Sequence, residues 1–175
     1  MLRPLDLVVL LKLSFNGERP TYLRMAQELH LYPSEVYTSI KRSCASHLIG
    51  EPRDRLNHSG LLEFLLHGVR YAFPVEKGAL TRGVPTAYAA PPLAESIAAS
   101  SDPPPVWPYA EGQVRGYSFS PLHKNVPRAA HEDPRLYELL ALVDALRDGR
   151  ARERDISGRQ LKKRLEDNSG AASKS

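Results

Sequence analysis

Proline placement limits the regular structure that this chain can form more than any other feature of its sequence. Eleven of the fifteen prolines lie from Pro74 to Pro134. Proline lacks a backbone N–H and fixes φ, so helix interiors and central strands rarely contain it. We therefore expect the segment from Pro74 to Pro108 to be an extended, irregular arm. Its aromatic residues, such as Tyr88 and Trp107, are unusual in a solvated spacer and indicate that the arm packs on the folded surface.

The segments on either side of this arm have the hydrophobic spacing of helices. Apolar periodicity, breakers and caps predict helices over residues 4–15, 22–29, 34–47 and 58–73, and again from 134 to a break at 149 and from 150 to 167. Asp133 followed by Pro134 is a strong helix start. Residues 50–57 are polar and turn-rich, the right size for a short hairpin, and 113–118 fit one strand. The predicted fold class is mainly α.

Composition narrows the possible functions. The net charge of +4 and the pI near 9.3 favour a polyanionic partner. A single cysteine, Cys44, excludes an intramolecular disulfide framework and fits a cytoplasmic protein, where we expect the thiol to be a small core residue. The six histidines have no zinc-ligand spacing, and no catalytic or nucleotide-binding motif is present. We expect neither an enzyme nor a metal or cofactor protein, and no segment suited to crossing a membrane.

Residues Thr21 to Ile49 carry the most informative pattern. A helix with a small residue and a leucine is followed by a tight turn and a second helix that begins near a serine. This pattern resembles the helix-turn-helix of MarR-like winged regulators, and the matching positions are Ala26, Leu29, Leu31, Ser34, Val36 and Ile40. Small and apolar side chains at these positions allow two helices to cross closely. His30 stands where the pattern usually has glycine, and histidine tolerates a positive φ better than most residues.

The resemblance covers residues 1–75 and implies a winged helix-turn-helix domain that binds double-stranded DNA. Residues on the outer side of the second helix would face base edges in the major groove: Ser34, Glu35, Tyr37, Thr38, Lys41 and Arg42. Tyr22 and Arg24 would lie near a phosphate strand, and Arg53 and Arg55 would contact DNA from the wing. The alternative for these charges is a solvated face. For Arg24 and the two wing arginines the two interpretations have equal weight.

The remaining chain divides into an arm over 76–132, helices over 133–167 and a tail over 168–175 that we expect to be disordered. The stripe from Leu136 to Leu146 needs a partner surface, either in its own domain or in a second copy, and we favour dimerisation through it. The basic helix from Arg150 to Asp167 could be a second DNA contact, although a solvated face fits it better.

These features predict a homodimeric, sequence-specific DNA-binding transcriptional regulator, which we expect to be a repressor. A helix-turn-helix can also serve protein contact alone. The alternative function is thus a protein-interaction adaptor, or an antitoxin that neutralises an operon-encoded toxin. The segment Arg82–Thr86, RGVPT, resembles a motif of abortive-infection antitoxins and motivates this alternative. Otherwise its glycine and proline only shape a surface turn.

Overall fold

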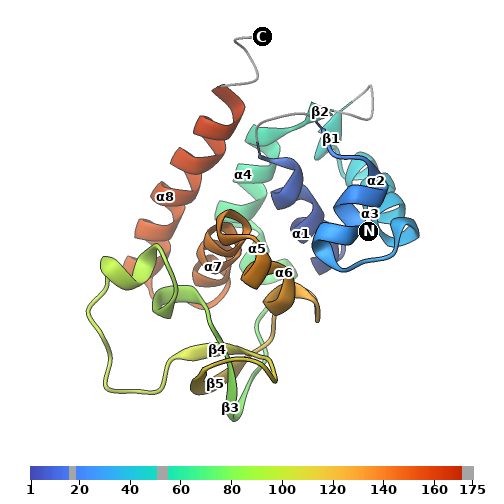
Figure 1. Ribbon diagram of the computed structural model, residues 1–175. Coiled ribbons are helices and arrows are strands. Elements are labelled where there is room, and N and C mark those ends of the chain that lie inside the picture. Colours follow the sequence, from blue (N-terminus) through green and yellow to red (C-terminus); the bar gives the residue numbers. More distant parts are fainter. Residues whose placement is uncertain (16–18, 51–54, 171–175) are drawn as a thin grey trace.

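The computed structural model describes residues 1–15, 19–50 and 55–170, and within them the fold is mainly helical with a small sheet (Figure 1). The first half contains α1 (Pro4–Leu13), α2 (Tyr22–Leu29), α3 (Pro33–Ala45), β1 (Ile49–Gly50), β2 (Arg55–Leu56), α4 (His58–His67) and α5 (Val69–Ala72). The second half contains β3 (Lys77–Pro85), the 3-10 turns η1 (Ala87–Ala89) and η2 (Leu93–Glu95), β4 (Pro105–Pro108), β5 (Val114–Phe119), α6 (Val126–Glu132), α7 (Pro134–Asp148) and α8 (Ala151–Gly170).

Helix α7 is the centre of the molecule. Its first turn forms as the sequence predicts, because the Asp133 carboxylate accepts the backbone N–H groups of Arg135 and Leu136, each at 3.1 Å. Helices α1, α4, α5, α6 and α8 all pack against it. Its leucines are buried within this one chain. The expectation that they face a second copy is therefore wrong, because neighbouring helices of the same chain already cover them.

Several helix boundaries differ from the predicted ones. The predicted helix over 58–73 is two helices that meet at Gly68, where an added Cβ would lie 2.9 Å from the Phe64 ring. Helix α3 begins at Pro33, one residue before the predicted start, with Tyr32 as its N-cap. Helix α8 continues to Gly170, so residues 168–170 of the expected disordered tail are helical. Residues 171–175 lie outside the described residues.

The proline-rich segment is more regular than predicted. Strand β3 pairs antiparallel with both β4 and β5, and β4 pairs parallel with β5, so the three strands close on one another. The strand expected over 113–118 is present as β5, but the irregular arm expected over 74–108 contains β3 and β4. The longer arm expected over 76–132 also contains helix α6. Glycine permits this close approach: a Cβ on Gly83 would lie 1.9 Å from the Trp107 carbonyl oxygen, and one on Gly116 would lie 2.0 Å from that of Pro104.

A buried polar cluster joins the sheet to α7. The Asp144 carboxylate accepts hydrogen bonds from the Trp107 indole N–H and the Thr86 hydroxyl, both at 2.7 Å, and from Arg147 at 2.8 Å. Arg147 also donates to the carbonyls of Phe73 and Ser120. Burial raises the pKa of Asp144, and the Arg147 charge opposes that shift. Because each partner comes from a different segment, this cluster fixes the sheet on the helix.

Residues Arg82 to Pro85 are the end of β3 and not a surface turn, and Thr86 follows the strand directly. Gly83 lies against Trp107, and the Pro85 carbonyl accepts the Tyr137 hydroxyl at 2.6 Å. Burial raises the pKa of Tyr137 to about 12, so the phenol stays protonated and can donate this bond. Gly83, Pro85 and Thr86 therefore hold the sheet on α7. The charged residue of this segment, Arg82, is exposed and takes no part in that packing.

Candidate nucleic-acid interface

Helices α2 and α3 meet at a tight, well-defined corner. The Thr21 hydroxyl caps α2 by accepting the Arg24 backbone N–H at 3.1 Å. The helix ends at His30, whose φ of 55° is left-handed, and the Leu31 N–H then donates to the Ala26 carbonyl at 2.8 Å. Of the side chains that were predicted to pack in the corner, Leu31 is half-buried and the others are buried: Ala26, Leu29, Val36 and Ile40. Cys44 is half-buried and packs against this core.

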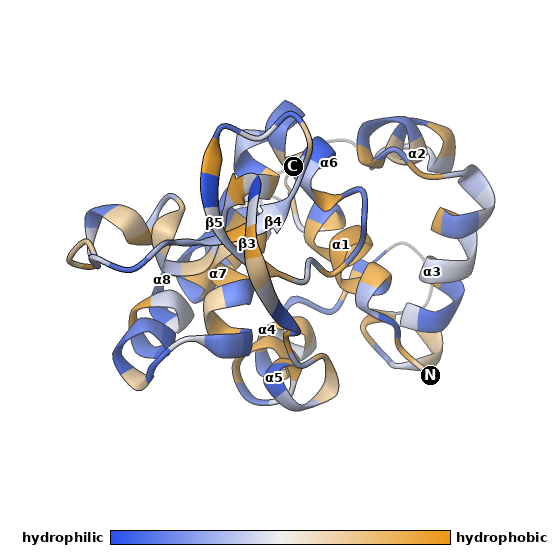
Figure 2. Cartoon of the chain, turned by 90° about the horizontal axis from the view of Figure 1, so that it is seen from below, coloured by the Kyte–Doolittle hydropathy of each residue, from blue (hydrophilic) through white to orange (hydrophobic). Residues whose placement is uncertain are grey.

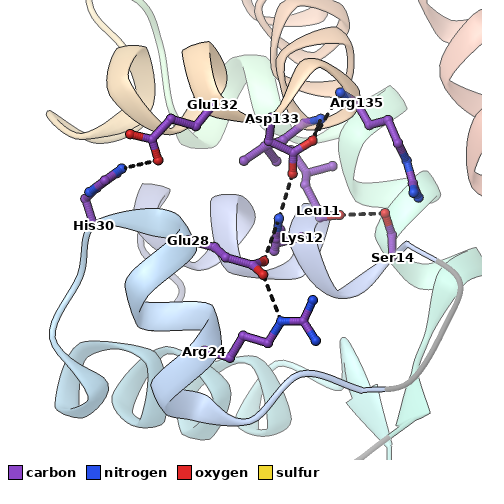
Figure 3. A network of polar contacts seen from close by, with 10 residues as sticks. Leu11, Lys12, Ser14, Arg24, Glu28, His30, Glu132, Asp133 and Arg135 are labelled. Carbon is purple, nitrogen blue, oxygen red and sulfur yellow. Dashed lines mark hydrogen bonds and ion pairs between the residues drawn. The ribbon is translucent and has the colours of Figure 1, made fainter.

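The second half of the chain holds this corner in place, as Figure 3 shows. The His30 imidazole Nε2 lies 2.8 Å from the Glu132 carboxylate at the end of α6. The Asn125 side-chain amide donates to the His30 carbonyl. Histidine therefore replaces glycine at the left-handed position and also supplies a side chain that contacts α6. The orientation of α3 thus depends on residues about 100 positions away in the sequence.

Lys12 forms a second link between the two halves (Figure 3). Its ammonium lies 2.8 Å from the Glu28 carboxylate of α2 and 2.6 Å from the Asp133 carboxylate that caps α7. Burial alone would raise the pKa of Asp133, but the hydrogen bonds from Lys12 and the Leu136 N–H hold it below its ordinary value. The Lys12 hydrogen bond likewise lowers the pKa of Glu28. One cation thus joins α1, α2 and the start of α7.

The outer face of α3 is open to solvent. Ser34, Tyr37, Thr38 and Lys41 are all exposed, with Tyr37 at 48% of its full area. The Thr38 hydroxyl donates to the Ser34 carbonyl at 2.7 Å, and the Glu35 carboxylate accepts the Tyr32 N–H at 2.8 Å. Within the described residues Lys41 has no ion-pair partner. The face therefore presents two hydroxyls, a phenol and one cation. The Glu35 carboxylate caps the start of the helix by accepting the Tyr32 N–H.

Arg42 does not lie on this face as predicted. Its guanidinium points toward α1, where Nε donates to Asp6 Oδ2 at 2.8 Å and Nη2 also donates to the carboxylate. Asp6 is fully buried, and its charge requires a partner in the interior. The signal that could have revealed this pair is a lone acid inside the apolar run of α1. Arg42 is therefore a structural partner of Asp6, and not a free cation beside Lys41.

The other predicted contacts are spread around this corner. The rings of Tyr22 and Tyr37 lie 6.2 Å apart, so the start of α2 contacts the outer face of α3. Arg24 is exposed and forms an ion pair with Glu28 at 2.9 Å. Arg55 is exposed on β2, which pairs antiparallel with β1. Arg53 lies outside the described residues.

Two exposed apolar side chains at the corner were not among the predicted contacts. Tyr32 is 74% exposed at the N-cap of α3, and Leu23 is 58% exposed on α2. The signal for Tyr32 is an aromatic residue in a turn directly before a proline, where no core position is available to it. Both side chains enlarge the surface that a partner of α3 would meet.

No family model matches the chain, and no curated protein or solved structure has significant similarity to it. Across residues 1–15, 19–50 and 55–170, no three histidine, cysteine or acidic side chains come together as a metal site would require. In the same ranges, no helix has the length and apolar character needed to span a bilayer.

Proposed function

We propose that residues 1–75 form a winged helix-turn-helix and that the chain is a sequence-specific, DNA-binding transcriptional regulator acting as a repressor. The observation that carries this proposal is the two-sided character of α3. Its inner face is buried against α1 and α2, whereas Ser34, Tyr37, Thr38 and Lys41 face solvent. A helix presented in this way fits the major groove of B-DNA, which is about 12 Å wide.

The exposed groups suit contact with both bases and phosphates. Hydroxyl groups of Ser34, Tyr37 and Thr38 can donate to or accept from base edges. The Lys41 ammonium provides the charge that attracts a phosphate. Arg55 on β2 would contact the sugar-phosphate backbone beside the groove. Because Arg42 is occupied by Asp6, Lys41 carries most of the electrostatic part of binding on α3.

The Lys41→Ala variant tests this assignment. Fluorescence anisotropy would follow binding of the protein to a labelled duplex from its own promoter region, with a scrambled duplex as the non-specific reference. We expect Lys41→Ala to weaken specific binding by roughly tenfold and to reduce the slope of log K against log salt concentration by about 1. Tyr37→Ala should weaken specific binding without changing that slope, because it removes no charge.

Lys163→Ala is the matched control, since Lys163 is exposed on α8 and its removal changes the net charge equally. This control should leave affinity for the specific duplex within about twofold. If Lys41→Ala and Lys163→Ala had equal effects, general electrostatics would explain binding, and the role of α3 would be wrong. Equal affinity for the promoter duplex and the scrambled duplex would contradict the proposal of sequence-specific recognition.

A further inference from the structure

Two arginines lie directly opposite each other on the sheet. In the antiparallel register of β3 and β5, Arg82 is paired with Arg115, and Leu80 is paired with Tyr117. Positions two apart on a strand share a face, so these four residues form one surface, here named the arginine–tyrosine patch. Leu80 and Tyr117 are 43% and 47% exposed, and both arginines are exposed. Figure 2 views β3 and β5 from the side on which they lie in front of the helices.

The opposed arginines have no anionic partner within the described residues. Like charges in directly opposed positions of an antiparallel pair are unfavourable. The strands cannot slip to separate them, because Gly83 fits against the Trp107 carbonyl of β4 and Gly116 fits against the Pro104 carbonyl directly before β4. The register is thus fixed by packing on one face and leaves the two arginines at directly opposed positions on the other. A bound oxyanion would relieve this repulsion, since a guanidinium fork matches phosphate geometry.

We propose that the arginine–tyrosine patch binds single-stranded nucleic acid, with a phosphate between Arg82 and Arg115 and an unpaired base on Tyr117. Unpaired bases expose flat apolar faces that stack on aromatic side chains, whereas the bases of a duplex hide those faces in the stack. Leu80 widens the apolar area beside the tyrosine. An acidic peptide would satisfy the arginines but offers no planar group for this apolar area.

The patch belongs to a sheet that is fixed to the rest of the fold. Here β4 pairs with both β3 and β5, and Trp107 of β4 is anchored on α7. The patch is therefore one outer surface of a closed sheet that is held on α7. It also lies on different elements from the α3 face, so it does not depend on the function proposed for α3.

Binding of the full chain to fluorescein-labelled dT20 would test the proposal by anisotropy, with an unlabelled 20-base-pair duplex and poly-L-glutamate as competitors. We expect Tyr117→Ala to raise the Kd for dT20 about tenfold. Arg82→Gln combined with Arg115→Gln should also raise it, and should reduce the slope of log K against log salt concentration by about 0.7, the value for one phosphate contact on a single strand.

The double variant Arg152→Gln, Lys163→Gln is the matched control, because it removes two exposed charges on α8. It should leave dT20 binding within about twofold, and thermal unfolding would verify that all variants fold. Absence of dT20 binding, insensitivity to Tyr117→Ala, or equal competition by poly-L-glutamate or duplex would overturn the proposal. Lys41→Ala should weaken binding to the promoter duplex and leave dT20 binding unchanged, so failure at one surface is distinguishable from failure at the other.

Discussion

Adjacent residues in this chain have opposite roles because of what surrounds them. Lys41 and Arg42 are neighbours on the polar side of α3, yet Lys41 is exposed and Arg42 reaches the buried Asp6. Helical geometry separates consecutive side chains by about 100°, which brings only one of the two toward α1. The acid in α1 then determines the role of Arg42, since a buried carboxylate without a partner would destabilise the fold by several kcal/mol.

Gly83 is the residue whose replacement should reveal the closed sheet most directly. Gly83→Ala would place a Cβ 1.9 Å from the Trp107 carbonyl oxygen, so the strands must separate. We expect a loss of about 3 kcal/mol in the free energy of unfolding, measured by urea denaturation. Gly78→Ala on the same strand is the control, since its nearest contact is the Ser118 Cβ at 3.2 Å. Equal stability of the two variants would contradict the close approach of β3 and β4.

At the scale of elements, contacts distant in sequence hold the α2–α3 corner. Thr21 and Asp133 cap their helices through neighbouring residues, and the sequence indicated both caps. The contacts of His30 with Glu132 and of Lys12 with Asp133 join elements more than 100 residues apart. Such side-chain pairs restrict how α3 can tilt relative to α7. The presentation of the α3 face is therefore a property of the assembled elements and not of the helix pair alone.

The Lys12 contacts should make stability depend on pH. The pKa of Asp133 is held below its ordinary value of 3.8, and that of Glu28 below 4.5. The two carboxylates therefore stabilise the fold fully above their ordinary pKa values, and this stabilisation is lost as the pH falls through the lowered pKa values. Burial opposes charge on Lys12, but its two carboxylate partners raise its pKa above 10.5. The stabilisation of the fold by the Lys12 charge is therefore lost only as the pH rises through that raised pKa.

We therefore expect Lys12→Met to reduce the free energy of unfolding by about 1–2 kcal/mol at pH 7, because all three groups are partly exposed. The difference between wild type and variant should shrink toward pH 3, as measured by urea denaturation at both pH values. Arg24→Met is the control, since Arg24 contacts Glu28 at the surface and does not reach Asp133. A difference that stayed constant from pH 7 to pH 3 would indicate packing by the Lys12 stem and not charge.

At the scale of the whole molecule, the chain has one continuous core. Buried residues from α1, α2, α3 and α4 belong to the same cluster as those from β4, β5, α7 and α8. Helix α7 contacts α1, α4 and α5, so the predicted boundary near residue 75 crosses the core and does not mark a linker. The resemblance to a winged helix-turn-helix thus covers a part of the chain that depends on the remainder for its packing.

A fragment of residues 1–75 should fold poorly by itself. Without α7, the apolar side of α1 and the inner side of α4 would face water. We expect the fragment to show no cooperative thermal transition by circular dichroism and to be digested rapidly by trypsin. The full chain should unfold in a single transition. A fragment with a sharp transition and resistance to trypsin would show that the N-terminal helices form an independent domain.

The sequence by itself determined the helices, because their signals are local. Apolar spacing, Thr21, Asp133 and the turn at His30 act within one or two helical turns, and the structure has helices where these signals predict them. Helix α6 is the exception, because it lies in the segment that was expected to be an extended arm. The same local signals indicated the strand β5 and the buried corner of Ala26, Leu29 and Val36.

Only the tertiary structure decided what the proline-rich segment, α7 and Arg42 do. Trp107 bonds to Asp144 across 37 residues, Arg42 bonds to Asp6 across 36, and α7 is enclosed by elements from both halves. Strand closure, burial of charge and coverage of an apolar helix depend on which distant segments meet. Sequence periodicity carries no information on those pairings, since it reports only the face that a segment must bury and not the surface that buries it.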